Sequence, residues 1–167
     1  MSDLNVGDPI TVTIKKFDPS QDDAPYDKTY TIPYTREMRV LETLDYIVEE
    51  IGDSLAFQWF CGAKKCGMCG VLVNGKPQLG CWEPAQREMT IEPLPNFPVV
   101  RDLVIDREQY DSNLEALTPR IQRTAEYPGF PEKLDSIVMK ETAIMSHCIE
   151  CMVCVSACPA VGENFFG

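Results

Sequence analysis

Residues 61–69 read Cys-Gly-Ala-Lys-Lys-Cys-Gly-Met-Cys, and this stretch decides the fold. Its three cysteines follow the spacing C-x4-C-x2-C, so they lie on a single short loop. Gly62, Gly67 and the following Gly70 allow the backbone to curl tightly and to approach whatever the sulfurs bind. The stretch therefore indicates a loop whose thiolates act together as ligands of one inorganic centre.

A fourth cysteine, Cys81, follows the loop after eleven further residues. A 2Fe-2S cluster needs two protein sulfurs for each tetrahedral iron, and three thiolates on one loop with a fourth on a neighbouring strand can surround it. The spacing is that of plant-type ferredoxins. It predicts a 2Fe-2S cluster on Cys61, Cys66, Cys69 and Cys81. Structural zinc sites usually come as paired short C-x2–4-C knuckles, so the spacing disfavours zinc.

Two lysines, Lys64 and Lys65, lie inside the loop. They could stabilise a reduced cluster electrostatically, or they could be exposed side chains without a role, and the sequence leaves both interpretations open. Backbone N–H groups of the loop are expected to point at the sulfurs and to tune the reduction potential.

A second cysteine run, Cys148-x2-Cys151-x2-Cys154-x3-Cys158-Pro159, has the spacing of bacterial ferredoxins. In proteins with two such clusters, the first three cysteines bind one cubane and the fourth binds the other. This sequence has one copy of the run, so a cubane here is one ligand short. Either the chain is truncated, or another chain supplies the rest, or Cys158 bends back. His147 could in principle ligate iron, although a solvent-facing or hydrogen-bonded side chain is the expectation.

The composition describes an acidic globular protein of 167 residues, 44% hydrophobic and 25% charged. Its 15 basic and 26 acidic residues give a formal charge of −11, which argues against binding nucleic acid or an anionic lipid surface. All eight cysteines fall into the two groups. Neither a leader nor an apolar stretch long enough to span a bilayer is recognisable, so we expect a cytoplasmic, reducing compartment and no disulfide scaffold.

The first hundred residues predict a small mixed α/β module. Strands are expected at 10–17 and 28–34, joined by a long polar loop. Apolar residues then recur at helical spacing from Arg39 to Ile51, and Gly52 is placed to end that helix. Residues 71–73 lead into Asn74-Gly75, a strong hairpin signal, with further strands at 78–81 and 89–92. This order is that of a β-grasp ferredoxin, a small sheet with a helix across one face.

Prolines at 93, 95 and 98 predict a domain boundary. We expect an α+β protein with a β-grasp 2Fe-2S domain over residues 1–98. A mainly α-helical bacterial-ferredoxin-like domain, here incomplete, is expected over residues 99–167. Its helices are predicted at 100–123, with a break at Pro119, and at 134–145.

Both cysteine groups, together with the segment 95–104 (Pro-Asn-Phe-Pro-Val-Val-Arg-Asp-Leu-Val), resemble the iron–sulfur subunit of succinate dehydrogenases and fumarate reductases, the respiratory complex II family. The resemblance covers nearly the whole chain. It implies an oxidoreductase subunit that conducts electrons and has no catalytic residue of its own. Electrons would pass between a FAD-containing catalytic subunit and quinone at a membrane-anchor subunit, through 2Fe-2S, 4Fe-4S and 3Fe-4S clusters. The protein would be peripheral at the inner face of the membrane through these partners.

Carried over residue by residue, the resemblance implies that Cys148, Cys151 and Cys154 bind the 4Fe-4S cluster and that Cys158 binds the 3Fe-4S cluster. The sequence departs from the family in two places. Gly62 stands where the family usually has arginine, and the C-terminal segment with the remaining cluster ligands is missing. A missing segment or a second chain would have to supply those ligands.

Three other functions would account for parts of this sequence. A related flavoprotein system could reduce another unsaturated acid and use thiols or a soluble carrier in place of quinone, which the missing segment favours slightly. An iron–sulfur sensor would need a regulatory surface such as a basic DNA-binding helix, and the acidic chain offers none. A structural zinc protein would be distinguished by its visible absorption spectrum.

Overall fold

The computed structural model of the protein describes residues 4–117, 126–131, 136–145, 147–162 and 165. They form two compact units, Met1–Asp106 with Glu150–Gly167, and Arg107–Ile149. Within the described residues, the first unit contains β1 (Pro9–Lys16), β2 (Tyr26–Pro33), α1 (Val40–Glu49), β3 (Gly70–Val73), β4 (Lys76–Leu79), β5 (Glu88–Glu92), β6 (Val99–Arg101), β7 (Val104–Ile105) and α4 (Val153–Ala157). The second unit contains α2 (Glu108–Leu117) and α3 (Ser136–Met145).

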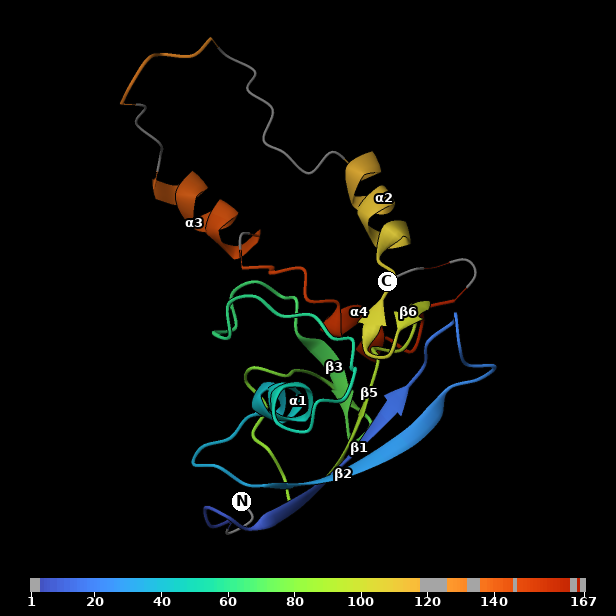
Figure 1. Cartoon of the computed structure of the whole chain (residues 1–167). Coiled ribbons are helices and arrows are strands. Elements are labelled where there is room, and N and C mark those ends of the chain that lie inside the picture. Colours follow the sequence, from blue (N-terminus) through green and yellow to red (C-terminus); the bar gives the residue numbers. More distant parts are fainter. Residues whose placement is uncertain (1–3, 118–125, 132–135, 146, 163–164, 166–167) are drawn as a thin grey trace. The chain divides into compact units, whose positions relative to one another are not determined.

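Five strands form one mixed sheet in the order β2-β1-β5-β3-β4 (Figure 1). Strand β1 pairs with β2 antiparallel and with β5 parallel, while β3 is antiparallel to both β4 and β5. The predicted strands at 10–17 and 28–34 and the predicted hairpin at Asn74-Gly75 are confirmed, with ends shifted by one or two residues. Inward residues Ile10, Val12 and Ile14 alternate with outward threonines along β1, which is the period of a half-buried strand.

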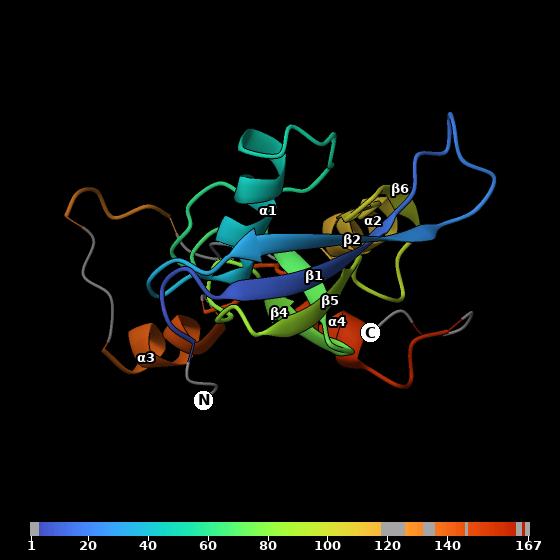
Figure 2. The same ribbon diagram turned by 60° about the horizontal axis from the view of Figure 1, so that its bottom comes forward.

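Helix α1 packs on one face of this sheet (Figure 2). Val40, Leu44 and Ile47 belong to the same buried core as the inward residues of the strands. The helix ends at Glu49, and Gly52 takes a left-handed backbone beyond it, with φ +74°. Ile51 therefore lies outside the helix and is exposed, although the sequence pattern assigned it to the apolar stripe.

The prediction of a helix beginning at Val100 is wrong, because residues 99–105 form the small two-stranded sheet β6-β7. Asp102 has a left-handed φ of 46°, which a right-handed helix does not contain. Its N–H donates to Phe17 O at 2.8 Å, and that of Leu103 donates to Ala56 O at 3.1 Å. Leu103 thus joins the core of the first unit, whereas Val100 is exposed, and the segment does not form a helical stripe.

In the second unit, the predicted helices are recovered in part. Helix α2 begins at Glu108, and α3 spans Ser136–Met145 where 134–145 was predicted. Pro119 and Ile121, at the predicted break, lie outside the described residues. No helix within the described part of the chain is long and apolar enough to cross a membrane.

Candidate metal centres

The first cysteine loop is held between the core of the sheet and its hairpin. Strand β3 begins at Gly70, directly after Cys69, and Cys81 follows the end of β4 by two residues. The N–H of Gly80 donates to Cys69 O at 2.8 Å and so ties the two strand ends together. Cys69 and Cys81 are both buried at this junction. The predicted return strand at 78–81 ends earlier, at Leu79, and Cys81 lies in the following turn.

The N-terminus of α1 fixes the segment that carries Cys81. A helix begins with N–H groups that have no partner within the helix. Here Val40 N donates to Glu83 O and Leu41 N donates to Gly80 O, each at 2.9 Å. The Arg39 guanidinium adds a 2.9 Å hydrogen bond to Trp82 O. The position of Cys81 is therefore set by the helix as well as by the hairpin.

The four cysteines of this group come together as two pairs. The Cys66 side chain hydrogen-bonds Cys61, and the Cys81 side chain hydrogen-bonds Cys69. Cys69 also interacts electrostatically with Cys66. In the part of the chain that the structure describes, no three Cys, His, Asp or Glu side chains surround the position of a single metal ion. Two adjoining pairs of thiols are instead the donor set that a two-iron cluster takes, with two sulfurs for each iron.

The two pairs lie in different electrostatic surroundings. Backbone N–H groups of Ala63 and Lys65, each 3.3 Å from Cys61 Sγ, lower the pKa of the Cys61 thiol to about 7, and the Cys66 side chain adds to this. Burial raises the pKa of Cys69 to about 11, and the neighbouring Cys81 thiol raises it further against an opposing backbone hydrogen bond from Cys81. The loop thus offers N–H donors to sulfur on its exposed side and excludes water on its buried side.

The loop's own geometry explains its glycines. Gly62 and Gly67 have left-handed φ values of 62° and 72°, where a side chain is unfavourable. A Cβ at Gly62 would meet no atom within 4 Å, so the backbone angle is what favours glycine there. Lys64 places its Nζ 5.1 Å from the centre of the Trp82 ring. Lys65 contributes its backbone N–H to Cys61.

Large apolar side chains are exposed at or next to this loop. They are Trp59, Phe60, Met68 and Trp82, and Phe60 is 81% exposed. We call these four residues the loop rim. Two of them, Trp59 and Phe60, directly precede the first cysteine, and Trp82 directly follows the last. Grouped exposed apolar side chains of this kind are typical of surfaces that bind another protein.

The second cysteine run divides between the two units. Cys151, Cys154 and Cys158 belong to the first unit, with Cys154 inside α4 and Cys158 at its C-terminal end. Cys148 is exposed and belongs to the second unit. His147, also exposed, donates its backbone N–H to Ile144 O at 3.3 Å within that unit. The structure therefore brings together the first predicted ligand set and, within one unit, places Cys151, Cys154 and Cys158 of the second.

One site-positioning residue that the sequence pattern did not reveal is Asp102. It is only 3% exposed, and its carboxylate accepts hydrogen bonds from Phe17 N at 2.9 Å and from Ala56 N at 2.8 Å. These bonds join the end of β1 to the segment that leads into the cysteine loop. Asp102 lies within the 95–104 segment that resembles the family, and this resemblance was the one sequence feature that pointed to it.

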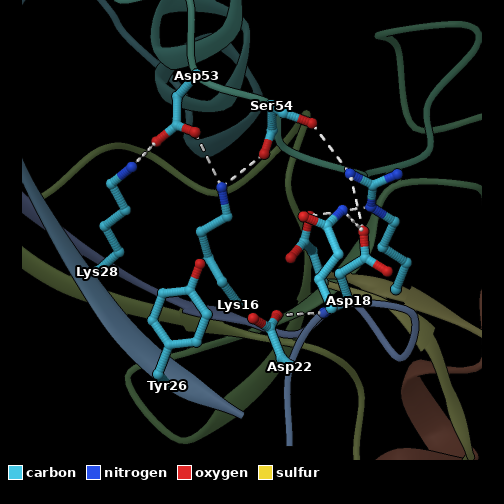
Figure 3. A pocket seen from close by; sticks show the side chains of 10 residues that line it. Lys16, Asp18, Asp22, Tyr26, Lys28, Asp53 and Ser54 are labelled. Atoms are coloured by element: carbon cyan, nitrogen blue, oxygen red, sulfur yellow. Dashed lines mark hydrogen bonds and ion pairs between the residues drawn. The ribbon is translucent and has the colours of Figure 1, made fainter. Parts of the chain in front are cut away.

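A second residue that was missed is Lys16, at the end of β1. Continuing the alternation of Ile10, Val12 and Ile14 places it on the buried face, and it is 6% exposed. Its Nζ lies 3.0 Å from Asp53, which also pairs with Lys28 (Figure 3). Asp53 also accepts a 2.6 Å hydrogen bond from Tyr30. Lys16, Lys28 and Asp53 line a polar pocket of about 200 Å³. The network fixes the chain just before the cysteine loop.

Comparisons with known proteins agree with this geometry. Residues 11–112 match the family model described as a 2Fe-2S iron–sulfur cluster binding domain. The chain is 33% identical over 93% of its length to the fumarate reductase iron–sulfur subunit of Haemophilus influenzae. It is 34% identical over 96% of its length to that of Mycobacterium tuberculosis. A chain of the Mycobacterium smegmatis Sdh1 complex superposes with a TM-score of 0.75 at 25% identity, covering 91% of this chain.

These relatives are longer than the chain described here. The chain spans 66% and 68% of the two curated relatives and 64% of the solved chain.

Proposed function

Because the chain belongs to the family of fumarate reductase iron–sulfur subunits, we propose that it carries electrons between a flavin-bearing catalytic subunit of the succinate/fumarate type and a separate acceptor. The observation that carries this proposal is the paired arrangement of Cys61 with Cys66 and of Cys69 with Cys81. The sequence around them matches the family model of a 2Fe-2S cluster binding domain. A protein of this kind supplies conduction, while the cofactor of its partner does the chemistry.

The residues around the four cysteines fit this cofactor. Bound there, a 2Fe-2S cluster supplies a one-electron redox centre. The chain's own groups orient it and tune it. The N–H groups of Ala63 and Lys65 donate to Cys61 and offset negative charge on sulfur, whereas buried Cys69 and Cys81 keep water from the other side.

For the second centre, we infer that Cys148, Cys151 and Cys154 bind a 4Fe-4S cluster and that Cys158 binds a further cluster of the 3Fe-4S type. The support is the spacing of the run together with the family. On the same grounds we propose two domains, a 2Fe-2S domain at 1–98 and a second cluster domain at 99–167. Ligands for the 3Fe-4S cluster would come from a further segment or another chain.

The partners are proposed from the family, and the loop rim suggests where one of them docks. Phe60 and Trp82 expose apolar surface beside the cysteines, so docking of the FAD-containing subunit there would bring its flavin close to the 2Fe-2S site. The acceptor would be quinone at a membrane-anchor subunit, which would hold the protein peripherally at the inner face of the membrane. The acidic charge of −11 disfavours direct binding to anionic lipid.

The two sites can be tested against each other in the chain copurified with its partners. Cys69→Ser should abolish the EPR signal of the reduced 2Fe-2S cluster and leave the cubane signal. Cys154→Ser should do the reverse, so each variant is the control for the other. Retention of the 2Fe-2S signal in Cys69→Ser, with normal iron content, would contradict the assigned ligands.

The acceptor is tested separately. After the complex has been reduced through its flavin, reoxidation by a quinone analogue is expected. Reoxidation by thiol-derived disulfides or by a soluble carrier, with no response to quinone, would replace the quinone assignment with the second kind of flavoprotein system.

A further inference from the structure

A single amide side chain caps the helix that carries Cys154. Asn96 Nδ2 donates to Val155 O at 3.0 Å and lies 3.5 Å from both Ser156 O and Cys158 O. These are carbonyls at the C-terminal end of α4, where the helix leaves carbonyls unbonded; Val155 O also accepts from Cys158 N at 3.2 Å. Asn96 therefore holds the backbone between Cys154 and Cys158 from outside the cysteine run.

The backbone of Asn96 is itself fixed. Its φ is 70°, in the left-handed region that asparagine and glycine tolerate best. Leu94 and Phe97 on either side are buried, with Leu94 only 2% exposed. The amide thus projects from a segment anchored in the core of the first unit.

A second contact lies at Cys151, at the other end of the same stretch. A Cβ built on Gly70 would lie 2.9 Å from Cys151 O and 2.8 Å from Leu94 Cδ1, closer than atoms of folded proteins approach. Gly70 directly follows Cys69 in the chain. Its missing side chain lets the backbone of the second cysteine run lie against the residue next to a ligand of the first site.

We propose that Asn96 is a positioning residue which, with the bare backbone of Gly70, clamps residues 151–158 onto the first cysteine loop and so sets the separation of the two redox sites. The inference rests on the proposed function for the identity of those sites. Because electron tunnelling weakens steeply with distance, a loop free to move away would slow transfer between them. The clamp is a property of this chain's own side chains and backbone.

The test uses Asn96→Gly in the full chain copurified with its partners. Glycine keeps the left-handed backbone and removes only the amide. Hydrogen–deuterium exchange of peptides covering 151–158 should become roughly fivefold faster or more, as expected for the loss of one hydrogen bond that holds the segment. The magnetic interaction between the two reduced clusters, measured from EPR relaxation, should weaken while the 2Fe-2S content stays unchanged.

Gly70→Ala tests the second contact. The added methyl group should push Cys151 away and weaken the same magnetic interaction. Gly162→Ala is the matched control, since a Cβ there meets no atom within 4 Å, and it should change neither measurement.

The outcomes separate this inference from the function on which it rests. Unchanged exchange of 151–158 in Asn96→Gly overturns the clamp, whatever the clusters do. Faster exchange with an unchanged magnetic interaction also overturns it, because Asn96 would then be only a helix cap. Absence of a cubane in the unaltered complex would contradict the proposed function, yet the exchange comparison would still decide whether the clamp exists.

Discussion

At the scale of single residues, the partly buried charge of Asp53 is stabilised by hydrogen bonds from its neighbours. Burial alone would raise the pKa of Asp53, but hydrogen bonds from Lys28, Tyr30 and Lys16, and the charge of Lys16, hold the pKa of that carboxyl well below its ordinary value of 3.8. Burial, with the hydrogen bond to the same carboxylate, raises the pKa of Tyr30 far above its ordinary range. One side chain therefore satisfies three donors at the entrance to the cysteine loop.

Asp53→Asn is expected to lower the free energy of unfolding by roughly 3 kcal/mol at neutral pH. The substitution leaves the buried Lys16 ammonium without its carboxylate, and breaking a buried pair costs about this much. Denaturant titration followed by circular dichroism measures the loss. A difference below about 0.5 kcal/mol would contradict the network's role.

The pH dependence of that difference has a definite sign. The pKa of Asp53 is depressed in the folded protein, so its stabilisation is complete above 3.8 and is lost as the pH falls through the folded-state value. The gap between wild type and Asp53→Asn should stay constant from about pH 7 to about pH 5 and narrow at lower pH. A gap that already closes between those two values would contradict the depressed pKa.

At the scale of elements, much of the first unit could be predicted because its strands and helix carry clean periods. Buried residues alternate along β1, as in a strand, and recur at helical spacing along α1. The Asn74-Gly75 pair predicts its turn from the local sequence alone. Residues 99–105 could not be predicted in this way. Their few spaced apolar residues fit a helix as well as an irregular buried segment, and only the contacts with Phe17 and Ala56 decide between the two.

The junction made by Asp102 gives a prediction about these elements. Asp102→Asn replaces one acceptor oxygen with an N–H₂ group, which would face either Phe17 N or Ala56 N and leave a buried donor unpaired. We expect the free energy of unfolding to fall by roughly 2 kcal/mol. The exposed Asp27→Asn serves as control and should shift it by less than about 0.5 kcal/mol. If denaturation shows equal losses of stability for the two substitutions, the claim that Asp102 joins these elements is contradicted.

The residues of the candidate site also divide into those that the sequence predicts and those that only the fold reveals. Four cysteines of the first group could be named from spacing alone, because a cluster loop is a local feature with a fixed ligand order. Asn96 and Lys16 could not be assigned their roles, since each acts on residues far away in the sequence. Long-range hydrogen bonds leave no periodic trace in a sequence, and only the fold reveals which carbonyls or carboxylates they meet.

At the scale of the whole molecule, the loop rim predicts where a partner binds. Phe60→Ser removes a side chain that is 81% exposed and has no place in the core. Affinity for the catalytic subunit should fall roughly tenfold or more, as for an aromatic anchor at an interface, with the 2Fe-2S content unchanged. Val6→Ser, at a residue 70% exposed elsewhere in the first unit, is the matched control. Equal affinities of the two variants, measured by titration of the purified subunits, would move the docking surface elsewhere.

The central claim is that the chain is an iron–sulfur conductor, and its most direct test is the iron and acid-labile sulfide content with EPR of the chain copurified with its partners. The account predicts iron and sulfide together, a 2Fe-2S signal on reduction, and a second signal from a cubane. An oxidised 3Fe-4S signal would mean that a further segment or chain completes the second site. Zinc without iron or sulfide would contradict the account.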